Sequence, residues 1–104
     1  MTRVILSSRA ERDIAEVLTY TRRRWGALKA REYGKLTKEA IAAIASDPQS
    51  GKSYDDDRPG VLGYHIAQRG RPARHILFYW IVRAGTVQVI RFLHDAMDFT
   101  GHLP

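Results

Sequence analysis

Two amphipathic segments separated by only two residues, Trp25 and Gly26, constrain the fold of this chain more than any other feature. In the first, residues 8–24, apolar side chains recur at steps of three and four: Ala10, Ile14, Val17, Leu18 and Thr21. In the second, residues 27–46, the side with the same spacing holds Ala30, Tyr33, Leu36, Ala40, Ile41 and Ile44. Because one or two residues connect them and Gly26 stops the first, two helices here must fold back on one another as an antiparallel hairpin. Their apolar side then needs a second layer to cover it.

Short runs of β-branched and aromatic residues supply that layer. We expect strands at Arg3–Leu6, about Leu62–Gln68, about Arg74–Val82 and Thr86–Leu93, with a loop from Gln49 to Gly60. Residues 83–85 form a tight turn, and the apolar run Ile76–Val82 is typical of a central strand buried on both faces. The predicted architecture is therefore α+β, a single domain over residues 1–104 in the order β-α-α-β-β-β. An N-terminal strand and an antiparallel helical hairpin pack on a mainly antiparallel sheet.

The ends of the helices carry their own signals. Ser8 and Glu11 have the spacing of a capping box, which predicts that Ser8 caps the first helix. Asp47-Pro48 ends the second helix. The three arginines of residues 22–24 lie in the last turn of the first helix, where positive charge is favourable to the helix dipole. Together with Trp25 they also suit a binding surface.

Composition excludes several classes of function. The chain has no cysteine, so disulfides, thiolate metal sites and cysteine nucleophiles are ruled out. None of its four histidines forms an i, i+4 pair on a helix, and we predict no metal site. A glycine-rich phosphate loop and a serine nucleophile elbow are also lacking, so no cofactor is expected. With no leader pattern and no run of about 18 apolar residues, we expect a cytoplasmic protein without membrane contact.

Positive charge is concentrated in the second half of the chain. The net charge is +6, and residues 58–94 hold six arginines and no acidic residue. Arginine outnumbers lysine by 13 to 4, and guanidinium groups favour bidentate contacts with phosphate or carboxylate. Such a segment attracts an anionic partner, either a nucleic acid or an acidic protein, unless it serves solubility alone.

Five aromatic residues are candidates for stacking on nucleic-acid bases: Trp25, Tyr33, Phe78, Tyr79 and Trp80. All five stand where the helix or strand periodicity indicates the core. We therefore favour core packing for them over base stacking.

A histidine among arginines offers one arrangement for catalysis. The residues that can border one concave face of the sheet are Arg69, Arg71, Arg74, Arg91 and His94. Cleavage of RNA needs a general acid–base and cations that stabilise the phosphorane, and His94 with Arg91 and a loop arginine meets that minimum. The simpler interpretation, which we favour, is that His94 hydrogen-bonds to the chain near the sheet edge while the arginines are solvated.

Motifs spread over nearly the whole chain resemble the ParE toxins of type II toxin–antitoxin systems, within the RelE/ParE superfamily. In the first half they are Ala10, Asp13-Ile14, Tyr20, Trp25-Gly26, Ala30, Tyr33, Asp47-Pro48 and Gly51. In the second half they are Arg58-Pro59-Gly60, His75–Tyr79, Ile90–His94, Met97-Asp98 and His102-Leu103. Each motif alone is weak, whereas their order and spacing within one small chain are specific.

The resemblance implies the small α+β toxin fold and growth inhibition, in the best-known members by poisoning DNA gyrase without enzymatic chemistry. It also implies a cognate ParD-type antitoxin that wraps its C-terminal segment around the toxin in a hetero-oligomer. Operator DNA would be bound only through that antitoxin. For contact with the target we expect Arg58, Arg74, Arg91, His94 and Met97. For the antitoxin we expect a groove along the hairpin and sheet edge, with apolar contacts not used by the core from Ile14, Leu18, Tyr33 and Leu36.

Two alternatives stay open. The first is a ribosome-dependent mRNA ribonuclease of the RelE branch, with His94 as acid–base and Arg71, Arg74 and Arg91 as phosphate clamps. The second is a family member that binds an antitoxin and is no longer toxic. Family members often carry an arginine where this chain has Leu62-Gly63, and the turn at residues 69–74 is rich in arginine. Both departures bear on the identity of the target, because ParE-like proteins do not all act on gyrase.

Overall fold

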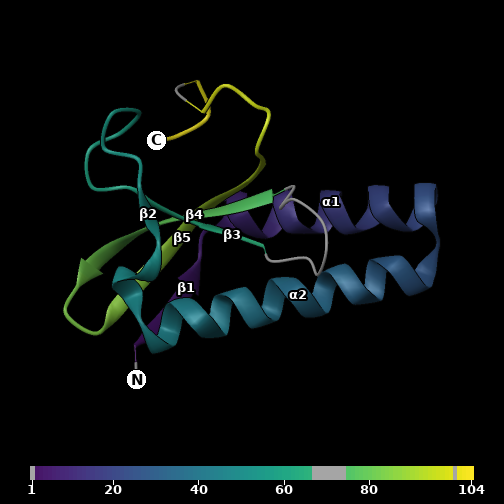
Figure 1. Cartoon of the computed structure of the whole chain (residues 1–104), viewed down its shortest axis with the longest axis horizontal. Helices are drawn as coiled ribbons and strands as arrows, with labels where there is room; N and C mark the ends of the chain where they lie inside the picture. Colours follow the sequence, from purple (N-terminus) through teal and green to yellow (C-terminus); the bar gives the residue numbers. More distant parts are fainter. Residues whose placement is uncertain (1, 67–74, 100) are drawn as a thin grey trace.

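A computed structural model describes residues 2–66, 75–99 and 101–104. Its elements are β1 (Arg3–Leu6), α1 (Ser8–Trp25), α2 (Ala27–Ser46), the 3-10 turn η1 (Pro48–Ser50), β2 (Lys52–Ser53), β3 (Leu62–His65), β4 (His75–Arg83) and β5 (Thr86–His94). The two helices run antiparallel beside the sheet, and the turn between them projects well beyond it (Figure 1). The α+β class, the N-terminal strand and the helical hairpin are confirmed.

Residues just outside α1 cap it at both ends. Ser7 has an extended backbone, and its hydroxyl oxygen accepts a hydrogen bond from the Ala10 N–H at 3.0 Å. The prediction that Ser8 is the cap was wrong by one residue, because Ser8 already lies in the first helical turn. At the other end Gly26 has φ 97°, a conformation that glycine adopts without a steric penalty, and donates its N–H to the Arg22 carbonyl.

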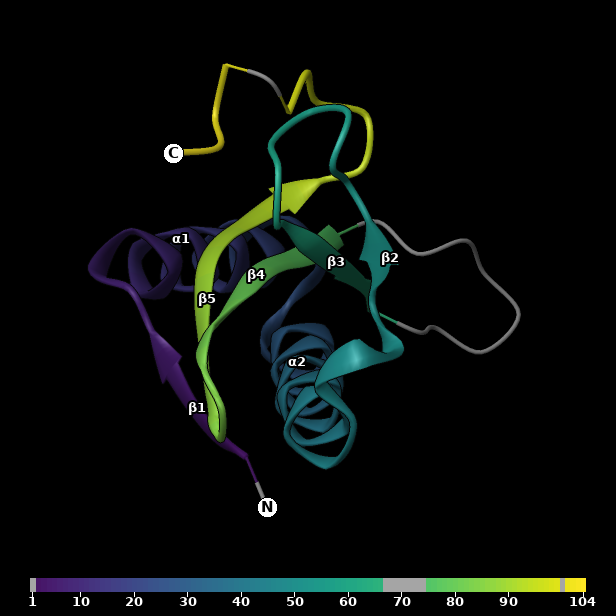
Figure 2. The same cartoon turned by 90° about the vertical axis from the view of Figure 1, so that its left-hand side faces the viewer.

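The sheet has five strands in the order β1-β5-β4-β3-β2. β1 runs parallel to β5, from Arg3 opposite Thr86 to Leu6 opposite Val89, and every other pair is antiparallel. Both helices lie on the same side of this twisted sheet (Figure 2). The expected, mainly antiparallel sheet is confirmed. Because β1 ends opposite Val89, residues 90–94 of β5 have no strand beside them on that side within the described part of the chain.

The segment between α2 and β3 holds two elements that the sequence analysis assigned to a loop. The strand β2 lies within the expected loop, η1 begins one residue before it, and β2 pairs with β3 over two residues only. A two-residue polar strand shows no hydrophobic alternation, so periodicity gives no signal for it. β3 itself ends at His65, and the rest of the predicted strand, from Ala67 on, lies outside the described residues.

β4 is the central strand, but it is buried over only part of its length. Residues 76–79 are buried, whereas Ile81 and Val82 are 39% and 49% exposed. The prediction of burial on both faces as far as Val82 was therefore wrong. β3 pairs only with residues 76–79 of β4, so the second half of the strand lacks that neighbour and meets solvent.

Two hydrophobic clusters hold the sheet. The larger joins the helices to it and contains Ala10, Tyr33, Ala40, Ile44, Ile66, Leu77, Tyr79, Val87, Val89 and Phe92. The second contains Tyr54, Val61, Ile76, Phe78, Ile90 and Leu93. Phe99 and Leu103 of the C-terminal segment pack against this second cluster. The loop at residues 54–61 and the C-terminal segment therefore meet at one end of the sheet, as both views show (Figures 1 and 2).

Candidate functional site

A buried ion pair joins α1 to β5 just beyond the end of β1. The Arg91 guanidinium donates from Nε to Oδ2 of Asp13 at 2.7 Å and from Nη2 to Oδ1 at 3.1 Å. Its Nη1 donates to the His102 carbonyl oxygen at 2.9 Å. Asp13 is 6% exposed and Arg91 is 9% exposed. One arginine thus ties the first helix, the last strand and the C-terminal segment together through charge-assisted hydrogen bonds.

The Asp13 carboxylate also completes the edge of the sheet. Its Oδ2 accepts the Phe92 N–H at 3.0 Å, where β1 no longer runs beside β5. A buried backbone donor left without a partner costs about 1–3 kcal/mol, so the carboxylate takes the place of a strand neighbour.

This ion pair corrects two expectations for Arg91, as a contact to the target and as a phosphate clamp. The side chain is buried and its charge is matched by a bidentate carboxylate, which a phosphate would have to displace. The sequence analysis grouped Arg91 with the basic residues around it and missed Asp13, which is 78 residues away. The one available signal was an aspartate next to the apolar Ile14 in the first helix.

His94 is half exposed at the end of β5, and its ring supports the local chain. Nδ1 accepts the Ala96 N–H at 3.0 Å and lies 3.2 Å from Oδ1 of Asp95. Both contacts are made by Nδ1 to the residues that directly follow β5, and the catalytic role considered for His94 stays a prediction.

Tyr33 and His75 form a pair that sequence reasoning missed. The Tyr33 hydroxyl and Nδ1 of His75 share a hydrogen bond of 2.5 Å, and the imidazole stacks on Phe92 with a centroid separation of 5.0 Å. Burial, together with the nearby His94, lowers the pKa of His75 to about 4 despite the opposing charge of Asp95. Tyr33 is only 7% exposed and belongs to the core, so the expectation that it offers an apolar contact outside the core was wrong.

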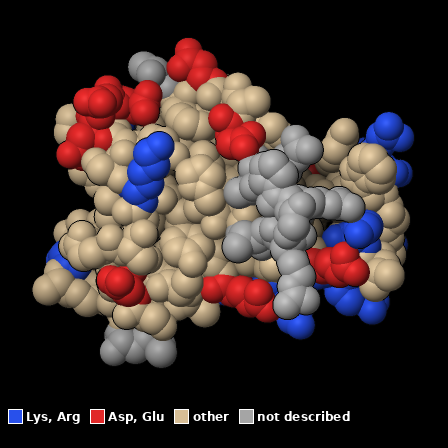
Figure 3. All heavy atoms as spheres, viewed as in Figure 1, with Lys and Arg blue, Asp and Glu red and all other residues tan. Residues whose placement is uncertain are grey.

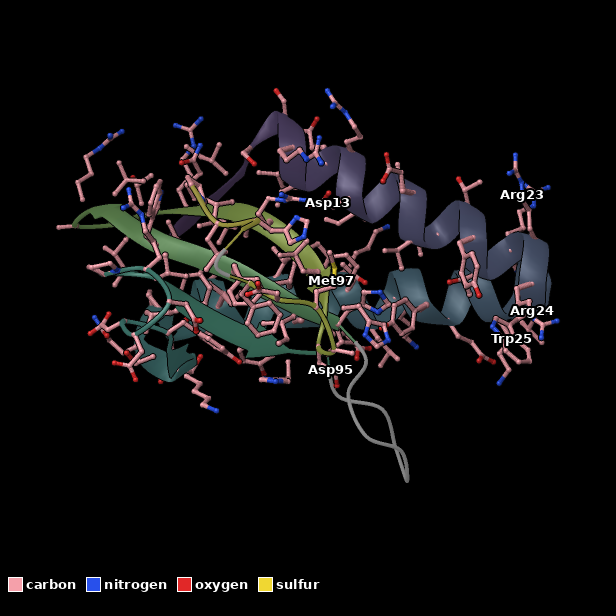
Figure 4. All side chains as sticks on the ribbon, turned by 90° about the horizontal axis from the view of Figure 1, so that it is seen from above. Asp13, Arg23, Arg24, Trp25, Asp95 and Met97 are labelled. Carbon is pink, nitrogen blue, oxygen red and sulfur yellow. The ribbon has the colours of Figure 1, made fainter. Side chains whose placement is uncertain are left out.

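Arg58 and Met97 lie in a region that we call the acidic end, defined by Asp55, Asp56, Asp57, Asp95 and Asp98. Arg58 is exposed and Met97 is 37% exposed. Burial raises the pKa of Tyr54, and the Asp57 and Asp95 carboxylates raise it further, so both carboxylates lie near this ring. Acidic side chains gather over this end of the surface in Figure 3, and Figure 4 shows Asp95 close to Met97. Two expected target contacts therefore stand in acidic surroundings.

The remaining arginines of the predicted catalytic and target-binding sets, Arg69, Arg71 and Arg74, lie outside the described residues. Among the residues that the structure does describe, no group of histidines and carboxylates is placed to hold a metal ion. No helix in the described part of the chain is long and apolar enough to cross a bilayer.

A shallow depression runs between the two helices near their turn. It is lined by Leu18, Thr19, Arg22, Ala27, Ala30 and Arg31. Ile14, Leu18 and Leu36 are all half-buried and pack against the core, and Leu18 also lines this depression. Of the four residues expected to meet an antitoxin, Leu18 is the one that lines an open surface.

The end of the helical hairpin is exposed and basic. We define the hairpin tip as Tyr20, Arg23, Arg24, Trp25 and Leu28. Tyr33, Phe78 and Tyr79 are buried as expected and Trp80 is half-buried, but Trp25 is 63% exposed. The prediction of core packing was wrong for Trp25, because it ends α1 where the hairpin has passed the edge of the sheet (Figure 4).

Comparison with known proteins identifies close matches over almost the whole chain. The family model for the ParE toxin of the type II toxin–antitoxin system parDE matches residues 4–99. Toxin ParE1 from Mycobacterium tuberculosis is 34% identical over 102 residues, which cover 98% of each chain. Toxin ParE1 from Caulobacter vibrioides is 33% identical over 99 residues, or 94% of each chain. Toxin ParE from Escherichia coli is 32% identical over 104 residues, or 99% of this chain and 94% of the relative.

The fold agrees with these matches. A chain in the solved structure of the chromosomal ParDE TA system from P. aeruginosa superposes with a TM-score of 0.69. The superposition covers 90% of this chain and 96% of that one, at 14% sequence identity. The architecture is thus that of a small α+β toxin domain, with a helical hairpin on one side of a mixed sheet. The chain belongs to the ParE toxin family of type II toxin–antitoxin systems.

Proposed function

We propose that this toxin inhibits growth in the cytoplasm by binding DNA gyrase and trapping the complex of gyrase with cleaved DNA. Trapping requires a surface that fits the enzyme and no chemical step by the toxin itself. The observation that carries the proposal is the acidic end, where Arg58, His94 and Met97 lie among five aspartates.

The charge of the acidic end favours a protein target over RNA. Its aspartates repel phosphate, and phosphate contacts dominate the affinity of proteins for nucleic acids. Exposed arginine and methionine side chains, in contrast, are enriched in protein–protein interfaces. Arg91, one of the proposed phosphate clamps, is already bound to Asp13. The family resemblance supports the same choice, because the best-known ParE toxins poison gyrase.

Purified toxin, free of antitoxin, tests the proposal in gyrase supercoiling and cleavage-complex assays on plasmid DNA. We expect linear DNA to accumulate and supercoiling to fall. Arg58→Ala and Met97→Ala should each weaken the effect about tenfold if they anchor the interface. Arg83→Ala removes an exposed charge at the far side of the sheet and should leave the effect unchanged. No linear DNA and full supercoiling at micromolar toxin would overturn the proposal for the gyrase tested.

His94→Ala separates this proposal from the ribonuclease alternative. For a gyrase poison, the folded variant keeps at least part of its effect, because His94 contributes contact area only. For a ribonuclease of the RelE branch, the variant is folded but inactive, and the parent chain cleaves mRNA on ribosomes while gyrase is unaffected. Normal growth on expression together with retained antitoxin binding would point to a member that is no longer toxic.

We also propose that a ParD-type antitoxin neutralises the toxin by laying a segment into the depression between the helices. Leu18 offers an apolar contact there, with Arg22 and Arg31 on the rim. These two arginines form no ion pair within the described part of the chain, so acidic side chains of the antitoxin have partners available. The hetero-oligomer would reach operator DNA through the antitoxin.

A charge reversal tests the antitoxin site without touching the core. Arg22→Glu/Arg31→Glu should weaken the complex by about tenfold or more, measured by isothermal titration with the cognate antitoxin. The matched control Arg3→Glu/Arg83→Glu makes the same change in net charge away from the depression. Equal weakening by both variants would mean that the depression is not the binding site.

A further inference from the structure

We infer that the hairpin tip is a binding surface for single-stranded nucleic acid, in which Tyr20 and Trp25 stack on bases and Arg23 and Arg24 contact phosphates. This surface is separate from the acidic end and from the depression between the helices. The inference does not rest on the gyrase proposal, because it concerns a property of the toxin alone.

Two aromatic side chains and two arginines lie close together in the last turns of α1. Tyr20 and Arg24 stand four residues apart on α1, so they are neighbours on one face of the helix. The Arg24 guanidinium lies over the Trp25 ring, 5.0 Å from its centroid. Arg24 therefore lies beside the Trp25 ring, whereas Tyr20 lines a depression on α1 together with Arg23 and Glu16. Figure 4 shows Arg24 beside Trp25 at the end of the hairpin, with Arg23 directed to another side.

The exposure of the tip favours base stacking over a structural role. Tyr20 is 64% exposed and Trp25 is 63% exposed, so both rings keep most of their surface open to a ligand. Single aromatic residues on a surface need no explanation, but two beside a pair of arginines on a projecting hairpin form a contiguous amphipathic patch. A flexible strand can wrap around such a convex tip, whereas a rigid duplex touches it along one line only.

The electrostatics of the tip suit an anionic ligand. Within the described residues neither Arg23 nor Arg24 forms an ion pair, and the one pair recorded near the turn joins Lys29 to Glu32 at 3.5 Å. The first turn of α2 holds no acidic residue, and its cap, Gly26, supplies no side-chain hydrogen bond. Asp95 of the acidic end lies about midway along the molecule, away from Arg23, Arg24 and Trp25 (Figure 4), and Glu16 lines a depression with Tyr20 and Arg23. Because no carboxylate in the described part of the chain pairs with Arg23 or Arg24, both guanidinium groups are available to a polyanion.

Fluorescence anisotropy with fluorescein-labelled oligo(dT) of about twelve nucleotides tests the inference on the full chain. Trp25→Ala should weaken binding about tenfold, and Trp25→Phe should restore most of it, because each stacked base contributes through the face of a ring. Trp80→Phe is the matched control for loss of a tryptophan. In that background Trp25 is the only tryptophan, and its fluorescence should be quenched on binding.

Salt dependence tests the arginines separately. Arg23→Gln/Arg24→Gln should lower the slope of log affinity against log salt by about 1.4, since each phosphate contact on a single strand contributes about 0.7. Arg3→Gln/Arg83→Gln removes the same net charge elsewhere and should leave the slope nearly unchanged. Circular dichroism confirms that each variant is folded.

Four results would overturn the inference. The first three are equal weakening by both arginine pairs, unchanged Trp25 fluorescence at saturating oligo(dT), and binding of duplex DNA as tight as that of the single strand. Competition by polyglutamate as effective as that by oligo(dT) would also overturn it, and would assign the tip to an acidic protein. A toxin that binds oligo(dT) yet leaves gyrase unaffected would refute the gyrase proposal alone.

Discussion

The two ends of the molecule use arginine in opposite ways. Beside the sheet, Arg91 is 9% exposed and directs three donors at Asp13 and the His102 carbonyl. At the hairpin tip, Arg23 and Arg24 are exposed, and neither forms an ion pair within the described residues. The first arginine is committed to the fold, whereas the other two are available to a partner. Positive charge in a sequence therefore indicates a binding surface only after the buried ion pairs have been set aside.

The largest effect is expected where the buried pair is broken. Asp13→Ala or Arg91→Ala should lower the free energy of unfolding by about 3–5 kcal/mol, because each leaves an uncompensated charge in a buried position. Asp13→Asn should cost less, since its amide oxygen can still accept the Phe92 N–H. Urea denaturation followed by circular dichroism measures the loss. A variant of either residue within about 1 kcal/mol of the parent would show that the pair does not hold the fold.

Gly63 in the sheet and Gly26 at the turn of the hairpin differ in the space available for a side chain. At Gly63 an added Cβ would lie 2.5 Å from Cε2 of Tyr54 and 2.9 Å from Cγ2 of Ile76, so Gly63→Ala should cost up to about 3 kcal/mol. At Gly26 no atom lies within 4 Å of an added Cβ, and only the φ of 97° opposes a side chain. With ψ at 168° this backbone conformation is essentially confined to glycine, so Gly26→Ala should cost about 1–3 kcal/mol through backbone strain rather than crowding. Thermal unfolding of both variants measures the two losses, and an unchanged melting temperature for either variant would contradict the corresponding cause.

The free energy of unfolding should depend on pH through His75, which begins β4 in the sheet. The pKa of His75 is about 4 in the folded chain, below its ordinary value of 6.5, so the unfolded chain binds this proton more readily. The contribution of the neutral ring is complete above pH 6.5 and is lost as the pH falls toward 4. Allowing for screening at the partly exposed ring, this loss is about 1–2 kcal/mol.

Denaturation of the parent and of His75→Gln at pH 7.5 and pH 4.5 isolates this contribution from that of the carboxylates. We expect a smaller loss of stability on acidification in the variant. Identical losses in the two proteins would show that His75 is not the group responsible.

The smallest effect on stability is expected at the tip. Arg23→Gln/Arg24→Gln removes favourable interactions with the dipole of α1, each about 0.3–1 kcal/mol, and the exposed contact of Arg24 with the Trp25 ring. The free energy of unfolding should fall by about 2 kcal/mol or less, measured in the same urea titrations as the buried pair. A loss comparable to that of Arg91→Ala would remove the distinction between the two ends.

The helical hairpin was predictable almost to the residue, while the short polar strand was not. The second helix spans Ala27–Ser46 as expected, because apolar spacing and the flanking Gly26 and Asp47-Pro48 are local signals. The strand Lys52–Ser53 exists only through its pairing with β3, and nothing in its two residues marks it. Ser7 rather than Ser8 caps α1, since adjacent serines carry the same local signal and the backbone conformation decides between them.

The candidate site was less predictable because its partners are distant in the chain. Arg58 and Met97 are exposed, as a contact surface requires, but the aspartates that surround them come from two separate segments. Tyr33 fits a helical stripe equally well as a core residue or as a partner contact, and its bond to His75, 42 residues away, places it in the core. For Trp25 the error was the reverse, since the residue was assigned to the core and is exposed. Periodicity does not show that the helical hairpin extends beyond the edge of the sheet.

The sequence by itself determined the two helices, the four longer strands, their order and the α+β class, because periodicity, capping and turn chemistry act over a few neighbouring residues. Only the tertiary structure decided which arginines are free. The parallel pairing of β1 with β5 ends at Val89, and this brings Asp13 beside Arg91 across 78 residues of chain. A charge is neutralised by whatever the fold places within hydrogen-bonding distance, and that neighbour is set by strand order rather than by local sequence.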